Sequence, residues 1–158
     1  MAGGLSTGIH FGLTSGVITT LGLIVGLHAG THSTLAVVGG VFTIAVADAL
    51  SDALGIHISK EAENTLSTRQ IWLATLATFT AKFVIAGTFL APLVLLPLAT
   101  AITVSVVWGL LVLAVLSVRL ARVQQLSPLP VILEHVGIGL VVVTLTHVIG
   151  DWVSRVFS

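Results

Sequence analysis

Long apolar runs separated by short polar segments make up almost the whole chain. A helix that crosses a bilayer needs about 20 mostly apolar residues, because the hydrocarbon core is about 30 Å thick. Runs of this length cover residues 8–30, 34–58, 71–92, 93–120 and 131–157. The pattern predicts an all-α, polytopic membrane protein with five transmembrane helices in a single domain, residues 1–158.

The polar connections between these runs predict the orientation of the chain. Basic residues fall in or beside only two of the four connections: Lys60, Arg69, Arg119 and Arg122. Because positive charge favours the cytoplasmic side, we expect residues 59–70 to be a short cytoplasmic connection. The N-terminus is then cytoplasmic and the C-terminus outside, with Arg155 as the one basic residue on the opposite side. A prokaryotic plasma membrane is the expected location.

Composition supports a lipid environment and excludes several kinds of function. The chain is 56% hydrophobic and only 8% charged, with a mean hydropathy of +1.16, whereas soluble domains are about 25% charged. Six basic and six acidic side chains give a formal net charge of zero, so nothing indicates a nucleic-acid partner. Cysteine is absent, which excludes disulfides and thiolate metal sites.

Glycines recur every four residues along the first run and resume the same step further on. They include Gly8, Gly12, Gly16, Gly22 and Gly26. Small residues at this spacing let helix backbones approach closely in lipid. The pattern is equally compatible with a homodimer packed through the first helices and with packing against neighbours in the same chain.

Two acidic residues interrupt the second run. Asp48 and Asp52 lie one turn apart on the same face of the predicted helix. A carboxylate in the membrane costs about 2.5–3.5 kcal/mol on insertion scales, so a positive partner is expected. Lys82 of the third run is one candidate, as a structural ion pair. A divalent cation or protons are the alternative, which we favour because one lysine cannot neutralise two carboxylates.

Other polar side chains gather near the two ends of the predicted spans. On the cytoplasmic side these are His10, His57, Glu61, Glu63, Glu134 and His135, and on the outer side they are His28, His32, His147 and Asp151. Ligands at both mouths with acids between them describe an ion path. We do not expect an enzyme, because no nucleophile stands beside a base.

Two segments carry a resemblance to a known family. "GLTSGVITTLGLIVGL" (residues 12–27) and "VADALSDALGIHISKEAE" (residues 46–63) resemble the first two helices of the vacuolar iron transporter family. Residues 77–97, "ATFTAKFVIAGTFLAPLVLLP", are similar to its third helix more weakly. The resemblance implies a homodimer whose first helices line a path for Fe²⁺ or Mn²⁺, exported from the cytosol in exchange for protons.

The chain departs from the family at its metal site. The family's first-helix aspartate falls on Ser15 and its second-helix methionine falls on Asp52, while the glutamate-rich cytoplasmic domain is reduced to Glu61 and Glu63. Carboxylate oxygen in place of a thioether favours harder ions such as Mn²⁺.

Residues and resemblance together predict a proton-coupled divalent metal transporter, with the metal as cargo and no resident cofactor. The predicted ligands are Asp48 and Asp52 with the neutral oxygens of Ser15 and Thr14, and the predicted cytoplasmic mouth consists of Glu61, Glu63, His57 and His10. The alternative is a helical structural or interaction subunit that transports nothing and holds a buried network of Asp48, Asp52 and Lys82.

Overall fold

The computed structural model describes residues 2–157, and every regular element in that range is a helix. The elements are α1 (Ala2–Thr31), α2 (Thr34–Glu63), α3 (Thr68–Thr88), α4 (Leu90–Leu95), α5 (Leu98–Val123) and α6 (Pro128–Phe157). With α3 and α4 counted as one span, five helices are long and apolar enough to cross a membrane. The predicted all-helical class and the five-span count are confirmed.

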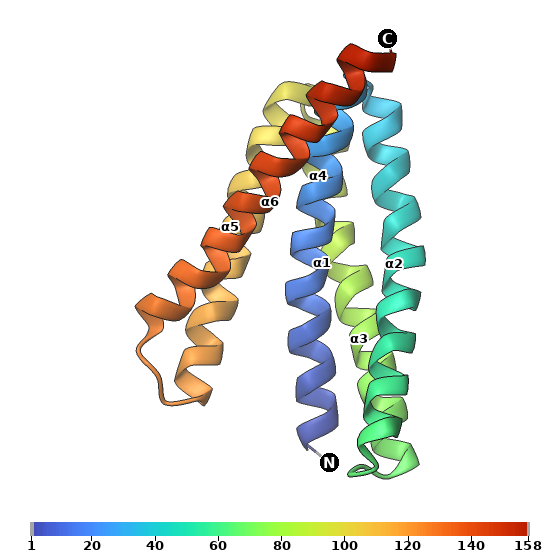
Figure 1. The fold of residues 1–158 in the computed structure, drawn as a ribbon, viewed down its shortest axis with the longest axis vertical. Coiled ribbons are helices and arrows are strands. Elements are labelled where there is room, and N and C mark those ends of the chain that lie inside the picture. The colour runs from blue at the N-terminus through green and yellow to red at the C-terminus, as the bar shows by residue number, and fades with distance from the viewer. Residues whose placement is uncertain (1, 158) are drawn as a thin grey trace.

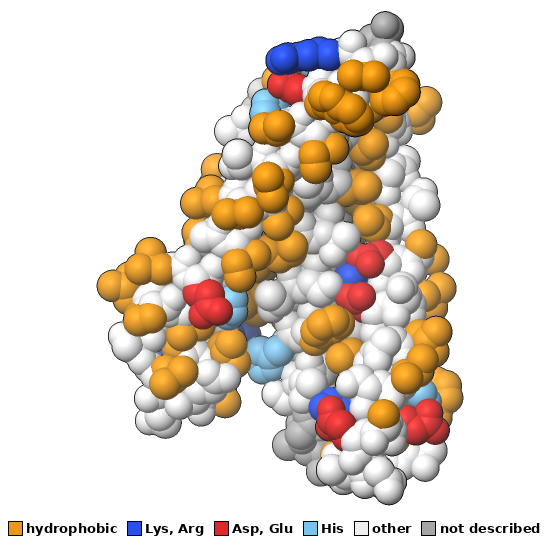
Figure 2. Space-filling view, in the orientation of Figure 1, with side chains coloured by type: hydrophobic (Ala, Val, Ile, Leu, Met, Phe, Trp, Pro, Cys, Tyr) orange, Lys and Arg blue, Asp and Glu red, His pale blue; other side chains and the backbone are white. Residues whose placement is uncertain are grey.

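Helix α1 is the centre of the bundle and contacts α2, α3, α5 and α6. In Figure 1, α1, α2 and α3 run side by side. The α5–α6 hairpin lies near α1 at the end where α1 finishes and diverges from it toward the end where α1 begins. The two termini lie at opposite ends of the molecule (Figure 1). Figure 2 shows the hollow that this divergence leaves between the two parts.

The glycines in the first half of α1 pack against α3 of the same chain. A Cβ atom placed on Gly8 would lie 2.3 Å from the carbonyl oxygen of Ala74, and one on Gly12 would lie 2.6 Å from that of Thr78. Neither distance leaves room for a side chain, so glycine is what permits this close approach. Of the two arrangements that the ladder allows, the structure shows packing within one chain.

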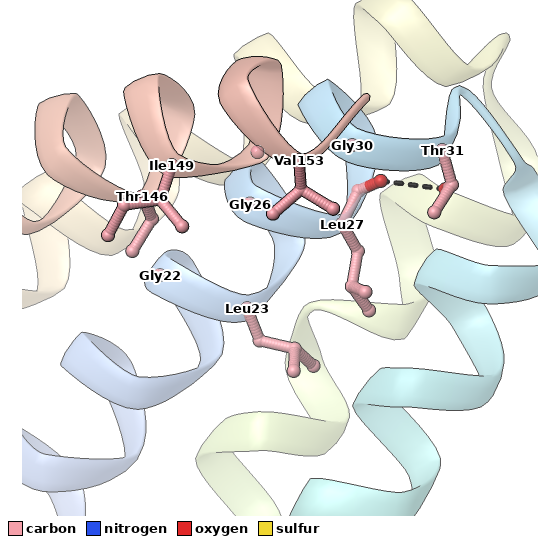
Figure 3. A pocket seen from close by; sticks show the side chains of 10 residues that line it. Gly22, Leu23, Gly26, Leu27, Gly30, Thr31, Thr146, Ile149 and Val153 are labelled. Atoms are coloured by element: carbon pink, nitrogen blue, oxygen red, sulfur yellow. Dashed lines mark hydrogen bonds between the residues drawn. The ribbon is translucent and has the colours of Figure 1, made fainter. Parts of the chain in front are cut away.

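The glycines in the second half of α1 pack against α6, which crosses α1 in Figure 3. Gly22 and Gly26 face Thr146, and a Cβ atom on Gly150 of α6 would lie 2.4 Å from the carbonyl oxygen of Gly26. The hydrophobic core lies in this half of the bundle, where Val17, Leu21 and Ile24 of α1 are fully buried.

The connection between the third and fourth spans differs from the sequence-based boundary at residues 92 and 93. Pro92 has no N–H to bond the carbonyl of Thr88, and α3 is interrupted there at Phe89, but helix resumes as α4. The span ends only at Leu96, which is extended (φ −120°, ψ 157°) because Pro97 follows it. The fourth span therefore begins at Leu98.

The cytoplasmic connection predicted over residues 59–70 is shorter in the structure. Helix α2 continues through Glu63, and Asn64 ends it in a left-handed conformation (φ 49°). Helix α3 begins at Thr68 after Ser67, whose hydroxyl and backbone form a capping box with Gln70. Only residues 64–67 join the two helices, so Glu61 and Glu63 are part of α2.

Candidate cation site

Asp48 and Asp52 of α2 point at one lysine of α3. The ammonium Nζ of Lys82 lies 2.5 Å from Oδ2 of Asp48 and forms a second ion pair with Oδ2 of Asp52. Lys82 is 2% exposed, while the Asp48 and Asp52 side chains are 25% and 22% exposed. The two carboxylates therefore share a buried cation that belongs to the protein itself.

Ser15 of α1 joins the same group. Its hydroxyl donates a 2.6 Å hydrogen bond to Oδ2 of Asp52 and accepts a 2.9 Å bond from Nζ of Lys82. We call Asp48, Asp52, Lys82 and Ser15 the charge cluster. Because its members come from α1, α2 and α3, it ties three spanning helices together.

A glycine of α1 makes room for the lysine. A Cβ atom on Gly16 would lie 3.1 Å from Cγ of Lys82 and 2.5 Å from Cγ2 of Ile85. The aliphatic part of Lys82 therefore passes over the bare backbone of α1 on its way to α2. Burying this stem while the ammonium meets acidic partners is the usual arrangement for a lysine in an apolar surrounding.

The two carboxylates are not held equally. Asp52 accepts hydrogen bonds from Lys82 and Ser15, whereas Oδ2 of Asp48 has no hydrogen bond of good geometry among the described residues and is held by the ion pair alone. Asp48 also lines a surface groove between α1 and α2 that continues along α2 to Ala36. Asp48 is thus the more weakly held carboxylate and the one that borders the groove.

The charge cluster keeps one negative charge when all its groups are ionised. It lies partly at the surface, because the Asp48 and Asp52 side chains are 25% and 22% exposed. An uncompensated charge at this depth in a membrane is costly. The arrangement therefore leaves one negative charge for a further positive partner to balance.

Of the two predicted neutral ligands, only Ser15 belongs to the cluster. Thr14 instead lines a separate small cavity between α1 and the α5–α6 hairpin, together with His10 and His135. Adjacent residues on a helix point about 100° apart, so Thr14 and Ser15 face different neighbours. In this structure Thr14 is not placed to act with Asp48 and Asp52.

The predicted cytoplasmic mouth is divided in the structure. His57 bonds the hydroxyl of Thr75 at 2.9 Å and packs edge-on against Trp72 with ring centroids 4.7 Å apart. Glu63 forms a 2.8 Å ion pair with Lys60 of the same helix. The backbone carbonyl of Glu61 accepts a hydrogen bond from the N–H of Asn64 at the end of α2. His10 lies elsewhere, in the cavity with Thr14.

The residues predicted for the outer mouth form two pairs in the structure. The rings of His28 and His32 are 5.5 Å apart. Nε2 of His147 lies 3.7 Å from Asp151, whose carboxylate is 4.0 Å from Arg155. This end of the bundle carries a polar group of imidazoles and one acid.

Among residues 2–157, no three side chains of His, Cys, Asp or Glu are grouped so that they could hold a metal ion. No family model, curated protein or solved structure matches the chain. The chemistry of the charge cluster is therefore the main guide to function.

Proposed function

We propose that the protein is a proton-coupled carrier of a divalent metal ion, Fe²⁺ or Mn²⁺, with Asp48 and Asp52 as its binding site. The observation that supports this most is that two membrane carboxylates share a single buried lysine. Intramembrane ionisable groups of this kind mark ion and proton pathways.

In this proposal Lys82 is a tethered cation that occupies the site when no metal is bound. An incoming metal ion displaces the Lys82 ammonium from the two carboxylates, and the hydroxyl of Ser15 supplies a neutral oxygen ligand beside them. Carboxylate and hydroxyl oxygens suit hard divalent ions. Proton binding to Asp48 and Asp52 weakens the site again and releases the metal, which couples metal movement to protons.

The direction of transport is proposed from charge and resemblance together. Four of the six basic residues lie at or near the connections at the N-terminal end, which favours a cytoplasmic position for that end. The resemblance to the vacuolar iron transporter family implies that the metal is exported from the cytosol and that the protein forms a homodimer. Gly8 and Gly12 already pack against α3 of the same chain, so a dimer packed through the first helices would use other residues of α1.

A second candidate function is a structural or interaction subunit. Its support is that Lys82 is only 2% exposed and already contacts both carboxylates. In this case the cluster fixes α1, α2 and α3 in register and nothing is transported.

Metal flux in proteoliposomes tests the proposal directly. We expect the wild-type protein to move Mn²⁺ or Fe²⁺ into or out of vesicles in response to a pH gradient. The double variant Asp48→Asn/Asp52→Asn should lose at least about 90% of this flux, because amide groups neither bind a hard cation as carboxylates do nor exchange protons. A metal-sensitive dye inside the vesicles gives the rate.

The matched control is Glu134→Gln. The sequence places Glu134 near the cytoplasmic mouth, but its side chain is exposed on α6, which contributes no residue to the charge cluster, so the flux should stay unchanged. Undiminished flux in the double aspartate variant would show that the site is wrong. A correctly folded wild-type protein that moves neither metal would favour the structural candidate instead.

A further inference from the structure

A small cavity beside the hollow between α1 and the α5–α6 hairpin holds two histidines. It is lined by His10 and Thr14 of α1, by His135 of α6, and by three leucines of α5, Leu113, Leu116 and Leu120. Its volume is about 20 Å³, which admits one water-sized occupant, since about 10–15 Å³ suffices for one. Figure 2 shows histidine side chains at the edge of this hollow.

A hydrogen bond fixes the tautomer of the His10 ring. Its Nδ1 lies 2.8 Å from the backbone carbonyl oxygen of Ser6 and 3.3 Å from the hydroxyl oxygen of the same residue, so the carbonyl contact is the shorter one. A carbonyl oxygen can only accept a hydrogen bond, so Nδ1 carries the proton. In the neutral ring, Nε2 then bears the lone pair.

Different partners fix the same tautomer in the ring of His135. The hydroxyl of Ser117 donates its only proton to the carbonyl oxygen of Leu113 at 2.6 Å. The 2.9 Å contact between Ser117 Oγ and His135 Nδ1 must therefore run from Nδ1–H to Oγ. His135 also keeps its lone pair on Nε2.

We propose that His10 and His135 form a binding site for one divalent transition metal ion. Metal-binding histidines usually donate one ring N–H to a protein oxygen, which orients the ring and leaves the other nitrogen for the metal. Both rings show this arrangement and both line a cavity of the size of one ion. Imidazole nitrogen suits Fe²⁺, Co²⁺, Ni²⁺, Cu²⁺ and Zn²⁺, and the hydroxyl of Thr14 in the same cavity supplies a further ligand.

In the proposed carrier, this site binds the metal ion before it reaches Asp48 and Asp52. That role rests on the proposed function. Thr14, in the cavity, directly precedes Ser15, which belongs to the charge cluster. A metal ion shared by His10 and His135 also joins α1 to the N-terminal half of α6. The close glycine contacts between α1 and α6 lie nearer the other end of both helices, at Gly22, Gly26 and Gly30.

Cobalt binding to the intact protein tests this site without any transport measurement. We expect Co²⁺ to bind the wild-type protein with visible d–d absorption bands that report nitrogen ligands. Zn²⁺ should protect His10 and His135 together from diethyl pyrocarbonate, with the modified residues mapped by mass spectrometry. His57 has the same Nδ1–H arrangement, toward Thr75, but it packs against Trp72 and does not line this cavity, so it should stay reactive.

Single variants on separate helices assign the ligands. His10→Gln and His135→Gln should each weaken Co²⁺ binding at least about tenfold, whereas His57→Gln should not. Because protection is measured on the wild-type protein, a variant that fails to fold does not decide the outcome. Equal modification of all three histidines with and without Zn²⁺, or unchanged Co²⁺ spectra in both variants, would overturn the site and leave only a water in the cavity.

The same titration in Asp48→Asn/Asp52→Asn separates this site from the carrier mechanism. Retained cobalt spectra with lost flux would support both proposals. Retained flux with retained spectra would support the histidine site and contradict the aspartate site. Loss of the cobalt spectra in this folded variant would contradict the histidine site.

Discussion

Replacing Lys82 with methionine is expected to lower the free energy of unfolding by about 3–5 kcal/mol in the absence of metal. The substitution keeps most of the buried stem but removes the ammonium, and it leaves two partly buried carboxylates without their partner. Breaking a buried ion pair from one side typically costs this much. Reversible unfolding in detergent micelles or bicelles measures the change.

Two additions to this variant separate the candidate functions. Combining Lys82→Met with Asp48→Asn and Asp52→Asn should restore most of the stability in either case, because no uncompensated charge remains. Adding Mn²⁺ to Lys82→Met should raise its stability only if the freed carboxylates bind metal, since a ligand stabilises the folded state it binds. A variant that is as stable as wild type without metal would show that Lys82 does not hold the carboxylates.

Replacing Gly8 with alanine is expected to lower the free energy of unfolding by about 1–3 kcal/mol, as overpacking usually does. The added Cβ would lie 2.3 Å from the backbone oxygen of Ala74, and backbone atoms cannot swing aside as a side chain can. Helix α3 must then move away from α1. The movement should also weaken the bond from Lys82 to Ser15, so the effect of Lys82→Met should be smaller in the Gly8→Ala background.

A glycine with free space provides the control. A Cβ atom on Gly39 of α2 would have no heavy atom within 4 Å, so Gly39→Ala should be neutral or stabilising by up to about 1 kcal/mol. Unfolding of the two variants under the same conditions gives the comparison. Equal stability of Gly8→Ala and wild type would mean that α1 and α3 are not packed through this contact.

The spans were largely predictable from sequence because lipid demands continuous apolar helices. The exception was the boundary between the third and fourth spans, where two prolines lie in one apolar run. Hydropathy alone does not reveal that Pro92 interrupts a span while Pro97 ends it. The difference lies in Leu96, which becomes extended before Pro97, whereas the residues around Pro92 stay helical.

The charge cluster was also partly predictable. Helical spacing placed Asp48 and Asp52 on one face and made Lys82 a candidate partner, and the structure joins all three. Thr14 was predicted as a neutral ligand together with Ser15, yet adjacent residues on a helix point in different directions, and Thr14 lines a separate cavity. The pairing of His10 with His135 depends on how α6 folds back beside α1, which no local pattern contains.

The central position of α1 has a consequence for how the chain is made. Synthesis runs from the N-terminus, and domains tend to form in that order. The first half of α1 finds its neighbour in α3, so the charge cluster has all its members once the third span is inserted. The second half of α1 packs against α6, which leaves the ribosome after the other five helices. Gly22 and Gly26 therefore face lipid or other protein until α6 is made, and a chain truncated before α6 should keep its ion pairs but lack the packing of α1 against α6.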